Sequence, residues 1–198
     1  MGKSYKIVVF GRSKTGKTLL IESLFYNNSF DDKIKNYRPT IDDIYPFYIE
    51  YEKGNKDRTH IYDTRGLENM DEQFIQYYLS FADAIIYVYN ASIRDITPSI
   101  ENIKNKKELI MTVIGTFLSA DQANLTSNRE TFHIPLWVFK DKVNHHIVHL
   151  NDTTSYVEPF SHLFAALSQA QNRSTSSFMS KKAKSFISEF SSISIKMD

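Results

Sequence analysis

Short apolar runs alternate with helical patterns along most of the chain. Residues 5–10 and 82–90 are rich in β-branched and aromatic side chains and carry few charges. Runs of this kind are typical of parallel strands that are covered on both faces. The shorter run at 59–63 and the run at 109–115 complete a set of four predicted buried strands.

Helical patterns separate these predicted strands. Leu20 and Leu24 are four residues apart behind the first strand, and a second helix is predicted to end near Ser80. A third helix is predicted after residue 155 from an apolar stripe of Val157, Phe160, Phe164 and Leu167. The alternation implies an α/β fold, with a mostly parallel sheet, helices on both faces and right-handed crossovers.

Two regions differ from this pattern. Residues 44–52 are strand-like but contain Pro46, which has no N–H to donate to a neighbouring strand, so we place them at an edge of the sheet. From about residue 171 the composition becomes rich in serine, and further on in lysine, as in a flexible tail. The predicted organisation is therefore one α/β domain, residues 1–170, followed by a tail, residues 171–198.

Composition narrows the choice of partners and compartment. The net charge of +1 predicts no nucleic-acid partner. The chain has no cysteine, which excludes disulfides, thiolate zinc sites, prenylation and palmitoylation. It shows neither a signal-peptide pattern nor an apolar run near transmembrane length. We expect a cytoplasmic protein with no lipid anchor of its own.

One motif indicates a specific binding site. Residues 11–18, GRSKTGKT, match G-x-x-x-x-G-K-[ST] in full and lie between a predicted strand and a predicted helix. In such a loop backbone N–H groups face phosphates, the lysine reaches the β- and γ-phosphates, and the last hydroxyl binds Mg²⁺. The candidate nucleotide-binding residues are Gly11, Ser13, Lys14, Thr15, Gly16, Lys17 and Thr18.

A second motif is the D-x-x-G pattern formed by Asp63 and Gly66 at the end of a predicted strand. In a Mg²⁺-dependent site such an aspartate holds a metal-bound water, and the glycine N–H can contact the γ-phosphate. Thr18 and Asp63 are therefore candidate metal residues, and Gly66 is a candidate nucleotide contact.

The order of three segments resembles the Ras family of small G proteins: the phosphate loop, YRPTIDDIY at 37–45 and YDTRG at 62–66. The resemblance implies a three-layer Ras-like G domain that binds GTP or GDP with Mg²⁺. It assigns Thr40 to Mg²⁺ and the γ-phosphate, and Tyr37 to covering the nucleotide. It also implies a partner surface around residues 37–52 and 64–80. Its candidate residues along the edge strand are Ile41, Asp42, Asp43 and Tyr45.

A phosphate-loop kinase is the competing enzyme class. It would need an arginine-bearing lid after the third buried strand, where Arg94 is the candidate. One arginine is a thin basis for a lid, and the segments at 37–45 and 62–66 favour the Ras-like interpretation.

Two positions near the expected γ-phosphate depart from the Ras pattern. Leu67 stands where Ras proteins carry the glutamine that orients the attacking water, and Ser13 stands where they keep a glycine beside the arginine finger. A leucine cannot hydrogen-bond water, and a side chain at position 13 obstructs the finger. We expect slow hydrolysis, poor rescue by activating proteins and a faster rate in Leu67→Gln.

A third departure concerns the base. Ras proteins carry N-K-x-D, whose aspartate accepts two hydrogen bonds from guanine, where this chain has TFLSADQ at 116–122. Thr116 and Phe117 replace the asparagine and lysine. Ser119 occupies the aspartate's register, with Asp121 two residues further on. Losing that contact weakens guanine selectivity. A pseudo-GTPase scaffold that binds partners regardless of nucleotide is therefore the alternative to a nucleotide-binding regulator.

Three stretches narrow the resemblance. YDTRGL at 62–67, SFAD…YVYN at 80–90 and EPFSHLFAALSQAQ at 158–171 resemble kappaB-Ras, the Ras-like proteins that interact with IκB. Members of that family are cytoplasmic, bind IκB proteins, associate with Ral GTPase-activating complexes and restrain NF-κB and Ral signalling. They ordinarily keep N-K-x-D, so the chain resembles a divergent member. The resemblance implies the same partners, and we expect a monomer in isolation.

The stretch HHIVH at 145–149 raises the question of a metal site. Strand alternation places His145 and His149 on one face, with no thiol and no suitably spaced carboxylate to complete a site. We therefore interpret these residues as ordinary histidines.

Overall fold

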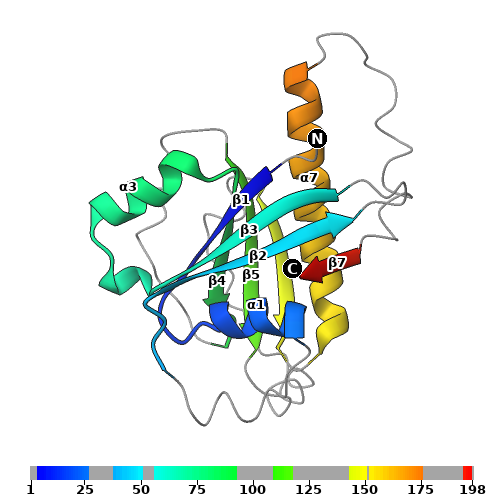
Figure 1. Cartoon of the computed structure of the whole chain (residues 1–198). Coiled ribbons are helices and arrows are strands. Elements are labelled where there is room, and N and C mark those ends of the chain that lie inside the picture. Colours follow the sequence, from blue (N-terminus) through cyan, green and yellow to red (C-terminus); the bar gives the residue numbers. More distant parts are fainter. Residues whose placement is uncertain are drawn as a thin grey trace.

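The computed structural model describes residues 4–26, 38–50, 56–92, 109–117, 143–150, 152–175 and 194–197. In these ranges seven strands form one sheet in the order β6-β5-β4-β1-β3-β2-β7, with helices on both faces (Figure 1). The strands are β1 Ser4–Phe10, β2 Asp42–Glu50, β3 Lys56–Thr64, β4 Ala84–Asn90, β5 Ile110–Phe117, β6 Asn144–His149 and β7 Ser194–Met197. This is the α/β layered fold that the sequence predicts.

The sheet is mostly parallel, as predicted. β1 lies between β3 and β4 and runs parallel to both, and β5 and β6 extend the parallel part. β2 and β7 run antiparallel to their neighbours. The helices are α1 Lys17–Tyr26, α3 Glu72–Phe81 and α7 Val157–Thr175, with short 3-10 turns η1 Leu67–Asn69 and η4 Thr153–Tyr156. None of the helices that the structure describes is long and apolar enough to span a bilayer.

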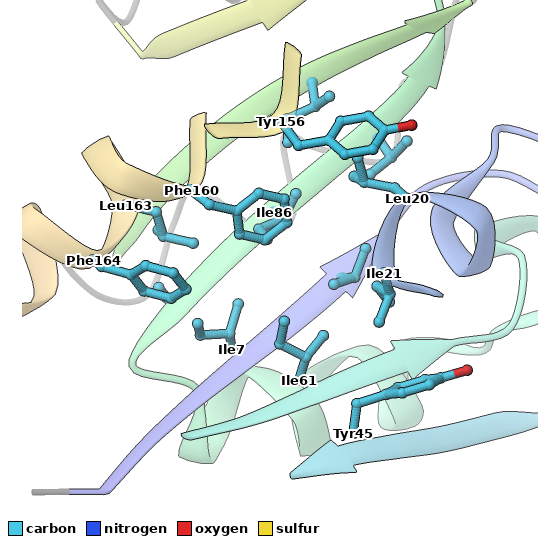
Figure 2. Close-up of a cluster of buried hydrophobic side chains, with 14 of the residues drawn as sticks. Ile7, Leu20, Ile21, Tyr45, Ile61, Ile86, Tyr156, Phe160, Leu163 and Phe164 are labelled. Carbon is cyan, nitrogen blue, oxygen red and sulfur yellow. The ribbon is translucent and has the colours of Figure 1, made fainter. Parts of the chain in front are cut away.

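Two hydrophobic clusters lie on opposite faces of the sheet. Ile7 and Val9 of β1 belong to the cluster with α1 and α7, whereas Val8 and Phe10 belong to the cluster with α3. This follows from the two-residue alternation of a strand. In Figure 2, isoleucines of β1, β3 and β4 lie between the apolar side chains of α1 and the aromatic side chains of α7. Both faces of the sheet are therefore covered.

The apolar stripe predicted for the last helix is confirmed for three of its four residues. Phe160, Phe164 and Leu167 are buried, but Val157 is 63% exposed because it lies at the first position of α7, outside the packed stripe. The turn η4 precedes the helix and is capped by Asp152, whose carboxylate accepts the N–H of Thr154 at 3.0 Å.

The C-terminal region differs from the flexible tail expected after residue 171. α7 continues to Thr175, and β7 pairs with residues 47–50 of β2 (Figure 1). β2 is therefore an edge strand only over residues 42–46, the half that ends at Pro46. The local sequence does not predict β7, because a four-residue strand is specified by the edge that it meets and not by its own periodicity.

Candidate nucleotide-binding site

The phosphate loop joins β1 to α1 and depends on two glycines. A Cβ on Gly11 would lie 2.1 Å from the carbonyl oxygen of Val88 in β4, so the loop passes too close to the sheet for any side chain. Gly16 has a φ of 88°, and Lys14 has a φ of 62° in the left-handed region. For a residue with a side chain this backbone conformation costs about 1 kcal/mol. Lys14 therefore stores strain within the candidate site.

Lys17 lies inside this loop. Its side chain is buried, and Nζ donates to the carbonyl oxygens of Gly11 at 3.1 Å and Arg12 at 3.0 Å. Burial lowers the pKa of Lys17, while the carboxylates of Asp63 and Glu68 raise it. A buried ammonium is costly, and the two groups that accept hydrogen bonds from Nζ are uncharged carbonyls. A phosphate group of a bound nucleotide would supply further negative charge.

The three predicted metal residues lie together, although they come from separate segments. Thr18 is in the first turn of α1, Thr40 precedes β2, and Asp63 is near the end of β3. The hydroxyl oxygens of Thr18 and Thr40 are 2.8 Å apart, and the Thr18 hydroxyl donates to Asp63 Oδ2 at 2.5 Å. An all-oxygen set of this kind suits Mg²⁺.

The state of Asp63 tests whether these residues fit Mg²⁺. Its side chain is buried, and Oδ1 has no hydrogen-bond partner within the described part of the chain. Burial raises the pKa of Asp63 to about 6, although Thr18 and Lys17 lower it. A buried carboxylate oxygen without a partner is costly, and a cation or its bound water would satisfy it. The residues present therefore fit Mg²⁺.

The segment after β3 packs directly on the phosphate loop. A Cβ on Gly66 would lie 2.2 Å from Ser13 Oγ, and the Glu68 carboxylate accepts the Ser13 N–H at 3.0 and 3.2 Å. Burial acts to raise the pKa of Glu68, but hydrogen bonds from Ser13 and from its own backbone outweigh burial and lower the pKa. The phosphate loop therefore already binds one carboxylate, that of Glu68. Sequence reasoning missed Glu68 because it lies beyond the D-x-x-G motif.

Leu67 points away from the loop. It is 5% exposed and belongs to the hydrophobic cluster on the α3 face, while its N–H donates to the Gly11 carbonyl oxygen at 3.1 Å. The side chain anchors the segment after β3 and offers no hydrogen bond to a water. The polar side chains next to it contact Ser13 instead: the Glu68 carboxylate accepts the Ser13 N–H, and Asn69 Nδ2 lies 3.5 Å from Ser13 Oγ.

The end of β5 supports the phosphate loop from the other side. The buried Thr116 hydroxyl donates to the Thr15 carbonyl oxygen at 2.6 Å and also lies 3.1 Å from the Tyr89 carbonyl oxygen. Thr116 therefore holds the loop at the position where the Ras resemblance expects an asparagine. Ser119, which occupies the register of the family's guanine-binding aspartate, and Asp121 lie outside the described residues, as does Tyr37.

Comparison with known proteins identifies the family. The family model described as Roc, the Ras of Complex domain of DAPkinase, matches residues 6–118. The chain is 30% identical over 194 residues to NF-kappa-B inhibitor-interacting Ras-like protein 1 of Mus musculus, covering 93% of this chain and 96% of the relative. It is 32% identical over 183 residues to NF-kappa-B inhibitor-interacting Ras-like protein of Drosophila melanogaster, covering 88% and 90%. The chain belongs to this Ras-like family.

In this Ras-like protein one ion pair joins β2 to the segment after β3. Arg65 Nη2 lies 2.5 Å from Asp42 Oδ2, Arg65 Nε donates to the Ile41 carbonyl oxygen at 3.2 Å, and the guanidinium lies 4.9 Å from the centre of the Phe74 ring. Burial and the Asp42 carboxylate raise the pKa of Tyr78 to about 12, which keeps this tyrosine neutral beside the pair. The Asp42 carboxylate is thus engaged within the protein.

The partner surface that the sequence predicts is exposed only in part. Ile41 and Asp43 are exposed, but Tyr45 is buried and stacks on Phe25 of α1, because alternation turns its side chain into the core. Three further apolar residues are exposed within the predicted ranges 37–52 and 64–80, although they were not singled out individually: Ile44 of β2, and Phe74 and Tyr77 of α3.

Proposed function

We propose that this Ras-like protein is a regulatory binding protein that holds GTP or GDP with Mg²⁺, hydrolyses it little and acts through protein partners. The observation that carries the proposal is the cluster of Thr18, Thr40 and Asp63 beside the buried Lys17, in which one carboxylate oxygen lacks a partner. Lys17 would contact the phosphates of a bound nucleotide, Thr18 and Thr40 would bind the metal, and Asp63 would hold a metal-bound water. Mg²⁺ supplies the charge that neutralises the phosphate oxygens.

Slow hydrolysis is supported by what surrounds Leu67. Its side chain lies in the apolar cluster, and the carboxylate of Glu68 is bound to the phosphate loop. Orientation of the attacking water needs a hydrogen-bonding group near the γ-phosphate. Neither residue is placed to supply one, so we propose that the protein retains nucleotide and does not turn it over briskly.

Nucleotide retention tests the proposal. Purified protein is mixed with labelled GTP, GDP and ATP, with and without Mg²⁺, beside Lys17→Ala and the exposed-lysine control Lys56→Ala. We expect Mg²⁺-dependent retention of guanine nucleotide in the wild type and the control, and its loss in Lys17→Ala, because Lys17 is the buried cation of the loop. Folding of each variant is checked by circular dichroism. No retention by the folded wild type would refute nucleotide binding.

The second candidate is a nucleotide-independent scaffold. It is favoured by the stretch at 116–122, where Thr116 and Phe117 replace the residues that the family uses for guanine. Thr116 holds the phosphate loop but does not by itself provide a contact to a base. In this case the retention assay is negative while partner binding persists, so the same preparation distinguishes the two candidates.

For the partner we propose an IκB protein, since the relatives are named as interacting with an inhibitor of NF-κB. Ral GTPase-activating complexes and a cytoplasmic location are proposed from the family resemblance alone. The docking surface that we propose, called here the β2–α3 surface, consists of Ile41, Ile44, Phe74 and Tyr77. Arg65 links its two parts, because it contacts both the Ile41 carbonyl and the Phe74 ring.

Substitutions on the β2–α3 surface should weaken partner binding. Tyr77 is 62% exposed, and Ile44 is 52% exposed on the unpaired half of β2. We expect Tyr77→Ala and Ile44→Asp each to weaken binding to a purified IκB protein by about tenfold, the usual effect of removing a central interface anchor. Isothermal titration calorimetry measures the dissociation constants.

The matched control for these variants is Val157→Asp. Val157 is 63% exposed at the start of α7 and is not part of the β2–α3 surface. We expect this variant to bind as the wild type does. Equal weakening by Val157→Asp, or unchanged binding by both surface variants, would place the docking site elsewhere.

A further inference from the structure

The histidines of β6 face opposite sides of the sheet. His145 and His149 lie on the α3 side, where His145 Nε2 is 2.8 Å from the Tyr89 hydroxyl and His149 stacks on Phe117 with ring centres 5.1 Å apart. These contacts occupy both rings. His146, between them, faces α7 because strand side chains alternate.

On the α7 side His146 meets two further metal-binding side chains. Glu158 and His162 are four residues apart, so they lie on the same face of the first turns of α7. One ligand atom from each of His146, Glu158 and His162 lies within 4.8 Å of the others. The rings of His146 and His162 are 5.2 Å apart. The cluster lies outside the phosphate-loop site.

A second observation concerns His146 itself. Its Nε2 atom is buried and has no hydrogen-bond partner among the residues that the structure describes. A buried ring nitrogen without a partner is costly, and a metal ion is one group that can satisfy it. The neutral imidazole, with one ring nitrogen free of hydrogen, is the form that metals bind.

We propose that His146, Glu158 and His162 form a binding site for one Zn²⁺ ion that joins β6 to the start of α7. Two imidazoles and one carboxylate are an established zinc ligand set, with one position left for water. Ligand atoms around a tetrahedral zinc are about 3.4 Å apart. Glu158 and His162 are exposed, so rotation of their side chains can close the present separations, which are at most 4.8 Å.

The ligand chemistry separates this site from the phosphate-loop site. Mg²⁺ prefers oxygen ligands, whereas imidazole nitrogen favours zinc and the neighbouring transition metals. The site therefore takes zinc in the presence of excess Mg²⁺. Since His146 belongs to the sheet and the other two ligands belong to α7, bound zinc stabilises the packing of this helix on the sheet.

The test is a zinc titration of the full chain, free of affinity tag and stripped of metal, in excess Mg²⁺ and against a chromophoric chelator. We expect one zinc per chain. Glu158→Gln and His162→Ala should each weaken binding by more than about tenfold, the lower limit found when even supporting groups of a metal site are removed. Both residues are exposed, so neither change threatens folding.

The matched control is His149→Gln, which removes an imidazole from the opposite face of β6. Binding should be unchanged in this variant. Co²⁺ provides an independent readout, because its visible absorption reports coordination geometry and the chain has no cysteine to contribute thiolate bands. Zinc should also raise the melting temperature of the wild type but not that of His162→Ala.

Three results would overturn the proposal: no zinc binding by the wild type, wild-type affinity in both α7 variants, or equal weakening in His149→Gln. The nucleotide-retention assay is independent of these outcomes. A negative zinc titration therefore leaves the proposed function intact, and the reverse also holds.

Discussion

Asp63→Asn will make the nucleotide-free protein more stable while weakening its hold on Mg²⁺ and nucleotide. Burial raises the pKa of Asp63 from 3.8 to about 6, so keeping this carboxylate ionised near pH 7 costs the folded state about 2–3 kcal/mol. An asparagine removes the charge and can still accept the hydrogen bond from Thr18. Losing the carboxylate that holds the metal's water should weaken Mg²⁺-dependent retention by about 10–100-fold.

The sign of the pH dependence follows from the raised pKa. The cost of the charge is full above the folded-state value and disappears as pH falls below the unfolded-state value, because the carboxyl is then protonated in both states. The stability advantage of Asp63→Asn should therefore shrink as the pH is lowered from about 7 to about 4. Denaturant unfolding at several pH values measures it, and release of a fluorescent nucleotide measures retention.

The control for Asp63→Asn is Glu72→Gln, which removes an exposed carboxylate from α3 that does not act on Asp63. We expect its free energy of unfolding to stay within about 0.5 kcal/mol of the wild type. If Asp63→Asn is less stable than the wild type near neutral pH, the buried carboxylate is stabilised in the nucleotide-free protein by something other than the contacts described.

Leu67→Gln should speed hydrolysis and destabilise the fold at the same time. The leucine is 5% exposed in the apolar cluster on the α3 face, so losing its burial costs about 2 kcal/mol. An amide buried there without partners is unfavourable, which favours a conformation with the side chain turned towards the phosphate loop. There it can orient a water, and we expect a severalfold faster single-turnover rate with GTP.

Leu67→Met separates the two effects. Methionine keeps the apolar volume, so we expect a stability loss below about 1.5 kcal/mol. It cannot hydrogen-bond water strongly, so the single-turnover rate should match the wild type. Brisk hydrolysis by the wild type, or an equal rate in the glutamine and methionine variants, would show that Leu67 does not limit hydrolysis.

Much of the fold was predictable because each buried strand can be recognised from its own short apolar run. The four buried runs became β1, β3, β4 and β5, and the parallel arrangement followed from the helices between them. β7 was not predictable, because its pairing with β2 joins residues about 150 positions apart. Half of the predicted edge strand is covered for the same reason.

The candidate site was likewise predictable from the sequence only in part. The phosphate loop is contiguous, so its glycines, Lys17 and Thr18 were found from spacing alone. Glu68 and Thr116 were missed as loop-holding residues, since neither contact with the loop has a sequence signature. Tyr45 was assigned to the surface but is buried, because exposure depends on which face the strand's register turns inward.

The sequence by itself determined that this chain is a Ras-like protein with a phosphate loop, a D-x-x-G aspartate and a leucine in place of the water-orienting glutamine. These features are local, since each motif carries its chemistry within a few adjacent residues. Only the tertiary structure decided where the side chains point. It turned Leu67 into the core and left one oxygen of Asp63 without a partner among the described residues. It also brought His146 close to Glu158 and His162, because the packing of α7 on β6 joins residues that form no recognisable sequence motif.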